Sequence, residues 1–302
     1  MADFSFLHNK KTGKWVILDP RRAKRPNVGN KAEAVCPFCI GKETEEQELY
    51  RVGGEKGDSN WHIRVIVNKF PFASHHEIVI HSPDHHKNFE ELPISHIELI
   101  LQTYRARYLE HHGCGQVYIF HNRGIGGGES LPHPHTQLTV IPKSISLDLP
   151  PLDTSFYSSG LFFRTKRREE VVGSSNFYIY CPVFSQWPDE VWIVPMRKNK
   201  CFGDISDKEI GDLAFCLNRL IGIFDLRHGH EFPFNFYIYP GRNWYLRILP
   251  RIKILGGFEM GTGIVVNTQD PRETFAFIKE HFFEPNLEKI REEQQEDYWK
   301  CV

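Results

Sequence analysis

The stretch "HTQLTVIPK" (residues 135–143) has a counterpart in the second half of the chain, "NWYLRILPR" (243–251). Both are runs of apolar, β-branched or aromatic residues of strand length, and both end in a proline followed by a basic residue. The strand expected before each of them also recurs, as "VYIF" (117–120) and "FYIY" (236–239). Two strands that return in the same order predict that the chain contains two copies of one unit.

The elements upstream of these strands repeat as well. "EIVIH" (77–81) matches "EVWIV" (190–194), and a helical pattern follows each. Ser95 with Glu98, and Ser206 with Glu209, have the spacing of a capping box that begins a helix. We therefore predict an α+β fold built by tandem duplication from antiparallel sheets with packed helices. The expected domains are residues 1–150, with the active site, and residues 151–302.

The two copies differ most at "ESLPHPHTQL" (129–138), which directly follows a glycine run. Aligned on the prolines that end the last strand, His135 matches Asn243 and His133 matches Gly241. The second copy also lacks the glycine run. A structural role would be needed in both copies, so the difference favours a functional site in the first half and a scaffold in the second. The alternative is a pair of surface histidines on a loop.

"CPFC" (36–39) has the spacing at which two thiolates bind one tetrahedral zinc ion. Redox pairs and unligated thiols share this spacing, so these alternatives stay open. The sequence contains no second C-x-x-C, and further ligands would therefore be histidines, from "HSPDHHK" (81–87) or from "HPH". Two cysteines and two histidines form a closed shell, which indicates a structural zinc.

Composition bounds the remaining possibilities. A net charge of −1 predicts no general attraction to nucleic acid or to an anionic membrane. We expect neither a signal peptide nor a membrane span, and a cytoplasmic location, because no apolar run approaches the required length. The seven cysteines are an odd number and mostly scattered, which indicates reduced thiols and no disulfide framework.

These motifs together resemble the galactose-1-phosphate uridylyltransferase family, a branch of the histidine-triad superfamily. The resemblance covers nearly the whole chain, in order: "KTGKWVILDPRRAKRPN" (11–27), "CPFC", "RVIVNKFP" (64–71), "SPDHHK" (82–87), "GGGESLPHPHTQL" (126–138) and "KILGGFEMGTG" (253–263). It implies two histidine-triad-like halves. The N-terminal half would hold the active site and the zinc, and the C-terminal half would be degenerate.

The resemblance also implies roles for single residues. One structural zinc per chain would be held by Cys36, Cys39, His85 and His133, with His86 as the alternative to its neighbour. The catalytic residues would be the nucleophile His135, with Gln137 and Ser130 at the transferring phosphoryl group. The substrate would be bound by Arg22, Arg25, Asn68, Asn122, Gly128, Lys253, Phe258 and Glu259. Family members with a second, iron-type site carry extra histidines in strands that here read "NFYIY" and "WYLRIL", so no second metal is expected.

The implied reaction moves a nucleoside monophosphate, with UMP as first choice, between a nucleotide sugar and a hexose 1-phosphate through a nucleotidyl-histidine. Lys69 stands where some uridylyl-specific members have an acidic residue, and this puts the base in question. The alternatives are a phosphorylase-type adenylyltransferase acting on ADP-glucose or a dinucleoside polyphosphate, and a catalytically idle nucleotide-binding protein. The expected partners are a nucleotide sugar, a sugar phosphate and a second copy in a homodimer.

Overall fold

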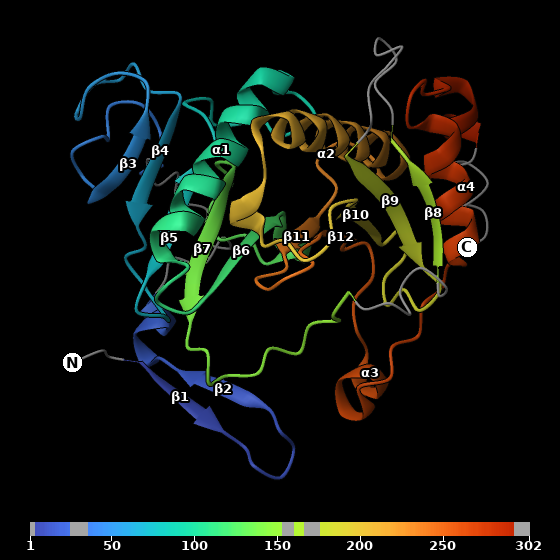
Figure 1. Ribbon diagram of the computed structural model, residues 1–302, viewed down its shortest axis with the longest axis horizontal. Helices are drawn as coiled ribbons and strands as arrows, with labels where there is room; N and C mark the ends of the chain where they lie inside the picture. The colour runs from blue at the N-terminus through green and yellow to red at the C-terminus, as the bar shows by residue number, and fades with distance from the viewer. Residues whose placement is uncertain (1–3, 25–35, 153–159, 166–175, 293–302) are drawn as a thin grey trace.

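The computed structural model describes residues 4–24, 36–152, 160–165 and 176–292. Ten of its strands form one antiparallel sheet (Figure 1). In spatial order the strands are β3 (Glu48–Val52), β4 (Ile63–Val67), β5 (His76–Ile80), β7 (His135–Ile141), β6 (Gln116–Arg123), β11 (Phe234–Ile238), β12 (Leu246–Pro250), β10 (Val191–Pro195), β9 (Phe177–Pro182) and β8 (Gly160–Arg164).

This order confirms the predicted duplication. From one edge to the centre the strands are β3, β4, β5, β7 and β6, and from the other edge they are β8, β9, β10, β12 and β11, which is the same arrangement of five consecutive strands. The registers agree: Val117 on β6 faces Val140 on β7, as Phe236 on β11 faces Ile248 on β12. The halves do not form two separate sheets, however. β6 pairs directly with β11, which satisfies the backbone groups that two free edges would leave open.

One proposed match between the copies is out of register. Glu77 turns toward the first long helix, where Arg107 and His111 hold its carboxylate. Glu190 lies on the opposite face of the sheet and accepts from Arg247 and from the Trp192 indole. Because side chains alternate along a strand, "EIVIH" and "EVWIV" are not equivalent residue by residue. The strand pairing instead relates His76, opposite Thr139, to Trp192, opposite Arg247.

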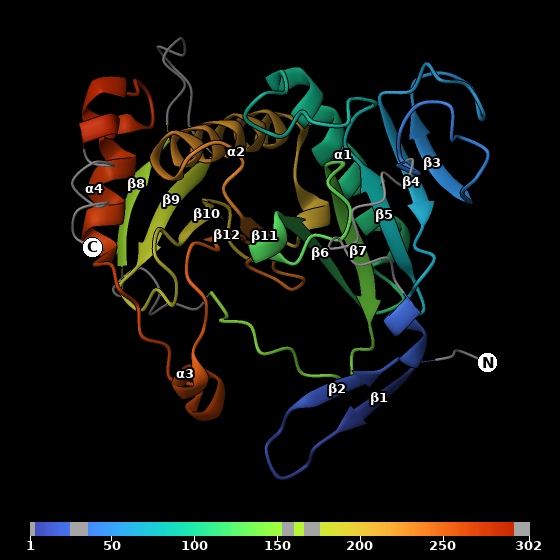
Figure 2. The ribbon, with the colours of Figure 1, turned by 180° about the vertical axis from the view of Figure 1, so that it is seen from behind.

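Two long helices, α1 (Ile94–His111) and α2 (Asp207–His228), cover one face of the sheet (Figures 1 and 2). The capping box of Ser206 and Glu209 is confirmed at the start of α2. The one predicted for Ser95 is wrong: the N-cap lies two residues earlier, at Pro93, which makes no side-chain cap, and α1 begins at Ile94. Proline fixes φ where a helix begins, so the turn starts without a hydroxyl.

The main core lies between this face and the two helices, and the largest buried side chains include Phe89, Tyr104, Phe177, Phe202, Phe224, Phe234, Phe236 and Phe282. The hairpin of β1 (Ser5–His8) and β2 (Trp15–Leu18) and the short helix α3 (Gly257–Thr262) project on the side away from α1 and α2, while α4 (Pro271–His281) packs beside β8 and β9 (Figures 1 and 2). Across the described segments, no helix is long and apolar enough to cross a membrane.

Candidate active site and metal centre

Both histidines of the HPH motif are buried, and a backbone carbonyl fixes the tautomer of each. The His135 Nδ1–H donates to the carbonyl oxygen of His133 at 2.8 Å, and the His133 Nε2–H donates to the carbonyl of Ser82 at 2.9 Å. A carbonyl can only accept, so each of these ring nitrogens carries the proton. The lone pairs therefore lie on Nε2 of His135 and on Nδ1 of His133.

His135 lines a cavity of about 330 Å³ on the sheet face opposite α1. The walls are largely apolar, and the residues that line it are Pro37, Phe38, Glu46, Ile66, Val67, Asn68, Lys69, Phe70, Ile78, Ser130, Leu131, His135 and Gln137. The Phe38 ring stands edge-on to the His135 imidazole, with centroids 5.3 Å apart. At the rim the Lys69 ammonium pairs with the Glu46 carboxylate at 2.6 Å. An apolar pocket with a few convergent polar groups is typical of a small-molecule site.

Beside this cavity, the structure gathers the predicted metal ligands, Cys36, Cys39, His85 and His133, whose ligand atoms all lie within 4.8 Å of one another. The Sγ–Nδ1 distances are 3.7 Å for Cys36 to His133, 3.6 Å for Cys39 to His133 and 3.2 Å for Cys39 to His85. A tetrahedral ion with bonds of about 2.3 Å to sulfur and 2.0–2.1 Å to nitrogen separates adjacent ligand atoms by about 3.6 Å. The cluster thus fits a metal ion, with His85 as the ligand, while His86 points into solvent.

Protonation in the cluster also suits metal binding. Burial lowers the pKa of His133 to about 4 and also lowers the pKa of His85, so both imidazoles are neutral near pH 7 and can coordinate. Burial raises the pKa of the Cys36 thiol to about 11, so this thiol would lose its proton only to a bound cation. Glu90, Asp225 and His230 also approach one another, but His230 is exposed and pairs with Asp225, a typical surface ion-pair arrangement.

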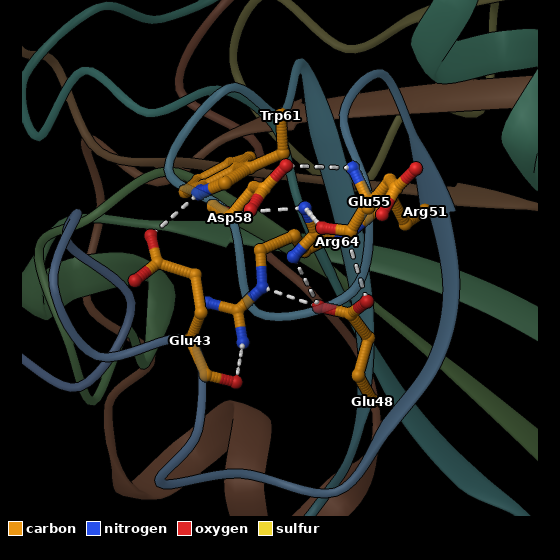
Figure 3. A network of polar contacts seen from close by, with 7 residues as sticks. All are labelled: Glu43, Glu48, Arg51, Glu55, Asp58, Trp61 and Arg64. Atoms are coloured by element: carbon orange, nitrogen blue, oxygen red, sulfur yellow. Dashed lines mark hydrogen bonds and ion pairs between the residues drawn. The ribbon is translucent and has the colours of Figure 1, made fainter.

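A buried polar network fastens the loop that follows the cysteines to β3 and β4 (Figure 3). The Arg64 guanidinium, fully buried, pairs with the Glu48 carboxylate at 2.7 Å and donates to the Glu43 carbonyl at 3.1 Å. The Glu43 carboxylate accepts from the Trp61 indole at 2.9 Å, and Arg51 supplies a second cation to Glu48. The loop that contributes Cys36 and Cys39 is therefore anchored by this network as well as by the metal cluster.

Gln137 and Asn68 both line the cavity, and both side chains contact His76, a residue that was not predicted from the sequence. His76 Nε2 lies 2.9 Å from Gln137 Oε1 and 3.1 Å from Asn68 Nδ2. Asn68 Oδ1 accepts from the Phe70 N–H at 2.8 Å, which orients the Asn68 amide. The missed residues are thus His76, Phe38 and Glu46. The alternation of side chains along a strand could have identified His76. It lies two residues before Ile78 and four before Ile80, so all three side chains point to the same face of the sheet.

The remaining predicted residues are less concentrated. Ser130 lines the cavity, whereas Asn122 lies outside it and accepts from Asn235 on β11 at 2.8 Å. Gly128, at φ 79°, ends a short 3₁₀ turn in an exposed position. Arg22 lies over the Phe72 ring and donates to the Phe70 carbonyl, near the cavity but not in its wall. Arg25 lies outside the described residues.

The C-terminal set is not brought to the cavity within this chain. The Lys253 ammonium pairs with Glu259 at 3.0 Å, and Phe258 is 56% exposed on α3. Figure 1 shows α3 standing apart from β5 and β7. Among the described residues, the single chain therefore does not bring these three predicted substrate-binding residues to the His135 cavity.

In the second half, the equivalent face of the sheet is filled. Tyr245, the register equivalent of Gln137, is fully buried and stacks on Trp192 with ring centroids 4.3 Å apart. Leu152, Tyr180, Val194 and Tyr237 complete this cluster. Aromatic packing thus occupies the place that the cavity has in the first half.

Comparison with known proteins agrees with this architecture. Residues 72–140 match the family model described as "Galactose-1-phosphate uridyl transferase, N-terminal domain". The chain is 29% identical to ADP-glucose phosphorylase of Arabidopsis thaliana over 89% of its length and 90% of the relative, and 26% identical to galactose-1-phosphate uridylyltransferase of Thermotoga maritima over 90% and 97%. Both relatives are thus covered almost completely.

Solved structures show the same fold. The crystal structure of the Arabidopsis thaliana ADP-glucose phosphorylase with bound ADP-glucose superposes with a TM-score of 0.68 at 25% identity, covering 92% of this chain and 99% of that one. A uridylyltransferase structure superposes with a TM-score of 0.70 at 21% identity, covering 91% and 97%.

Proposed function

We propose, since this chain belongs to the galactose-1-phosphate uridylyltransferase family, that it is a nucleotidyltransferase which moves UMP between a nucleotide sugar and a hexose 1-phosphate. The observation that carries the proposal is the tautomer of His135. Its Nδ1–H is engaged by the His133 carbonyl, so the lone pair of Nε2 is the nucleophile in a cavity that also contains Gln137 and Ser130. A neutral imidazole attacks phosphorus without a prior deprotonation step.

The proposed reaction has two displacement steps at the same phosphorus. In the first, Nε2 of His135 attacks the α-phosphorus of the nucleotide sugar, the P–N bond forms, and the P–O bond to the sugar phosphate breaks. In the second, a phosphate oxygen of the other hexose 1-phosphate attacks, and the P–N bond breaks. Gln137 and Ser130 would donate to the phosphoryl oxygens, and the backbone of the glycine run would add further donors. Catalysis of this kind depends on positioning, which the fixed histidine tautomer favours.

For the metal cluster we propose zinc, in a structural role. Two thiols and two imidazoles form a closed tetrahedral shell that suits zinc and leaves no position for a water molecule. The ion would hold the Cys36–Cys39 loop, and with it Phe38, against the HPH strand. The chemistry at phosphorus would then be performed by the side chains in the cavity.

We further propose that the protein is a cytoplasmic homodimer. Segment 252–266 carries six exposed large apolar residues, and such a group is typical of a contact surface. They are Ile252, Ile254, Phe258, Met260, Ile264 and Val266. In the dimer, Lys253, Phe258 and Glu259 would serve the hexose end of the substrate, with Arg22, Arg25, Asn68, Asn122 and Gly128 at its nucleotide and phosphate groups. The division at residue 150 into an active and a degenerate domain is part of the same proposal.

A second candidate function is phosphorolysis of ADP-glucose, with inorganic phosphate as the acceptor and AMP as the transferred group. It is favoured by the 29% identity to ADP-glucose phosphorylase over nearly the full length of both chains. Lys69 at the cavity rim adds to it, because a cation replaces the acidic residue expected of some uridylyl-specific relatives.

The test is to incubate the protein separately with UDP-glucose, ADP-glucose and diadenosine tetraphosphate and to measure its intact mass. A gain of one UMP with UDP-glucose supports the first function, and a gain of one AMP with ADP-glucose supports the second. His135→Ala should gain no mass, although it should fold and retain its metal. Turnover of a donor by wild-type protein that never carries a nucleotide would rule out the covalent mechanism.

A further inference from the structure

His76 occupies a buried position next to the side chains that the proposed reaction uses. It lies on β5 with only 3% of its surface exposed, and it shares a strand face with Ile78, which lines the cavity. Its ring touches the Phe72 ring edge-on at 4.3 Å. A buried imidazole beside an apolar ring is costly unless its nitrogens are bonded, so its contacts define what it does.

The shorter contact of His76 Nε2, to Gln137 Oε1 at 2.9 Å, requires a proton on Nε2, so Asn68 Nδ2 at 3.1 Å from this nitrogen is a contact between two donors and not a hydrogen bond. The Phe72 N–H points at His76 Nδ1 at 3.4 Å, so Nδ1 is the acceptor and Nε2 carries the proton. The Nε2–H then donates to Gln137 Oε1 at 2.9 Å. Asn68 Nδ2 donates to the same oxygen at 3.5 Å, while Asn68 Oδ1 is held by Phe70. Two donors therefore converge on the Gln137 carboxamide oxygen, and its NH₂ group is left to face the cavity that Gln137 lines.

The second half of the chain provides an internal comparison. Strand register relates His76 to Trp192 and Gln137 to Tyr245. Those two aromatic rings stack at an interplanar angle of 15°. The sheet thus accepts apolar packing at both positions, and the polar His76–Gln137 pair is not needed to build it.

We propose that His76 is a positioning residue, which holds the Gln137 carboxamide oxygen so that the NH₂ group is presented to the transferring phosphoryl group. This inference rests on the proposed nucleotidyl transfer for its catalytic consequence. Without His76 the Gln137 amide could turn its oxygen toward the phosphate, where oxygen would repel oxygen. His76 itself is not among the residues that line the cavity.

The test compares His76→Phe, which keeps a ring but removes the donor, with His76→Gln, whose amide N–H can replace Nε2–H. Removing one preorganised donor from a transition state typically costs about 10²–10³ in rate. A donor that is present but misdirected should cost less than a donor that is removed. We therefore expect His76→Phe to slow single-turnover nucleotidylation about 10- to 100-fold, with little change in affinity for the nucleotide donor. His76→Gln should recover most of the rate. In a Gln137→Met background, His76→Phe should have no further effect. His75→Phe, at the exposed neighbouring position, is the matched control and should behave as wild type.

A second readout does not depend on activity. The side-chain amide signals of Gln137, assigned by their loss in Gln137→Met, should shift or broaden in His76→Phe and return in His76→Gln. An unchanged amide signal, an unchanged rate, or an equal rate loss in the Gln137→Met background would each overturn the inference. If the amide signals respond as expected but wild type accepts no nucleotide from any donor, then the proposed function fails and the positioning contact stands.

Discussion

Replacing Arg64 by methionine should destabilise the protein more than any surface change of the same kind. The guanidinium is fully buried and bonded to the Glu48 carboxylate and the Glu43 carbonyl (Figure 3). Removing one partner of a buried ion pair costs about 3–5 kcal/mol. Glu48 keeps Arg51, at 2.8 and 3.1 Å, which places the expected loss in the free energy of unfolding near the lower end, at about 3 kcal/mol.

The same change should loosen the metal. Burial tends to raise the pKa of Glu48, but the hydrogen bonds and charges of Arg51 and Arg64 outweigh it and lower this pKa. Without Arg64 the carboxylate is less well compensated, and the loop after Cys39 loses one of its two anchors. We expect zinc to pass to a competing chelator faster from Arg64→Met than from wild type.

Urea denaturation at fixed metal concentration measures the first effect, and chelator competition measures the second. Arg272→Met is the control, since the Arg272 side chain is 78% exposed and its guanidinium pairs with the Asp270 carboxylate at 3.6 Å. Exposed pairs of this kind contribute little. A loss below about 1 kcal/mol in Arg64→Met, or unchanged release of metal, would refute the view that this network is a buried anchor for the loop.

Three further outcomes are expected. Cys39→Ser should bind less than one zinc per chain by metal analysis, whereas His86→Ala should bind as wild type; equal loss in both would contradict the ligand assignment. Burial lowers the pKa of His121 to about 3, so below about pH 6 the unfolded state binds a proton that folded His121 does not. This group alone should lower the free energy of unfolding by about 1.4 kcal/mol per pH unit as the pH drops. His121→Phe should flatten this slope by one proton in urea titrations, and an unchanged slope would exclude His121 as its source. Gly127→Ala should slow nucleotidylation, because a Cβ there would lie 2.8 Å from the Phe234 carbonyl oxygen, and the loop must shift; wild-type rates would show that the loop position is unimportant.

Much of the site could be predicted because its residues are local in sequence. The HPH spacing places two imidazoles on one strand face, and "CPFC" brings two thiols together whatever the fold. His85 could not be separated from His86 by pattern, since the choice depends on how the turn after β5 directs each ring. His76 escaped notice because its function arises from contacts with Gln137, sixty-one residues away, and with Asn68.

The sequence predicted the two copies of the repeat, but it did not predict that their strands join into one sheet. Similar strands indicate two copies, yet nothing in the composition of β6 or β11 says that they pair with each other. The alignment of Glu77 with Glu190 was also wrong in register, although both glutamates begin similar apolar runs. Glu77 faces helix α1, whereas Glu190 faces the aromatic cluster on the other side of the sheet. Among the described residues, the chain does not bring the predicted residues around α3 to the cavity, and no sequence pattern indicated this.

Because β6 pairs with β11, a side chain of the second half reaches the glycine run of the first half. Asn235, on β11, donates to the Gly127 carbonyl at 2.7 Å and to Asn122 at 2.8 Å, and Arg251 in turn bonds Asn235 at 2.9 Å. The glycine run of the first half is therefore held in place by a side chain of the second half. A substitution at Asn235 or Arg251 in the second half would therefore disturb a loop of the first half, so each half depends structurally on the other.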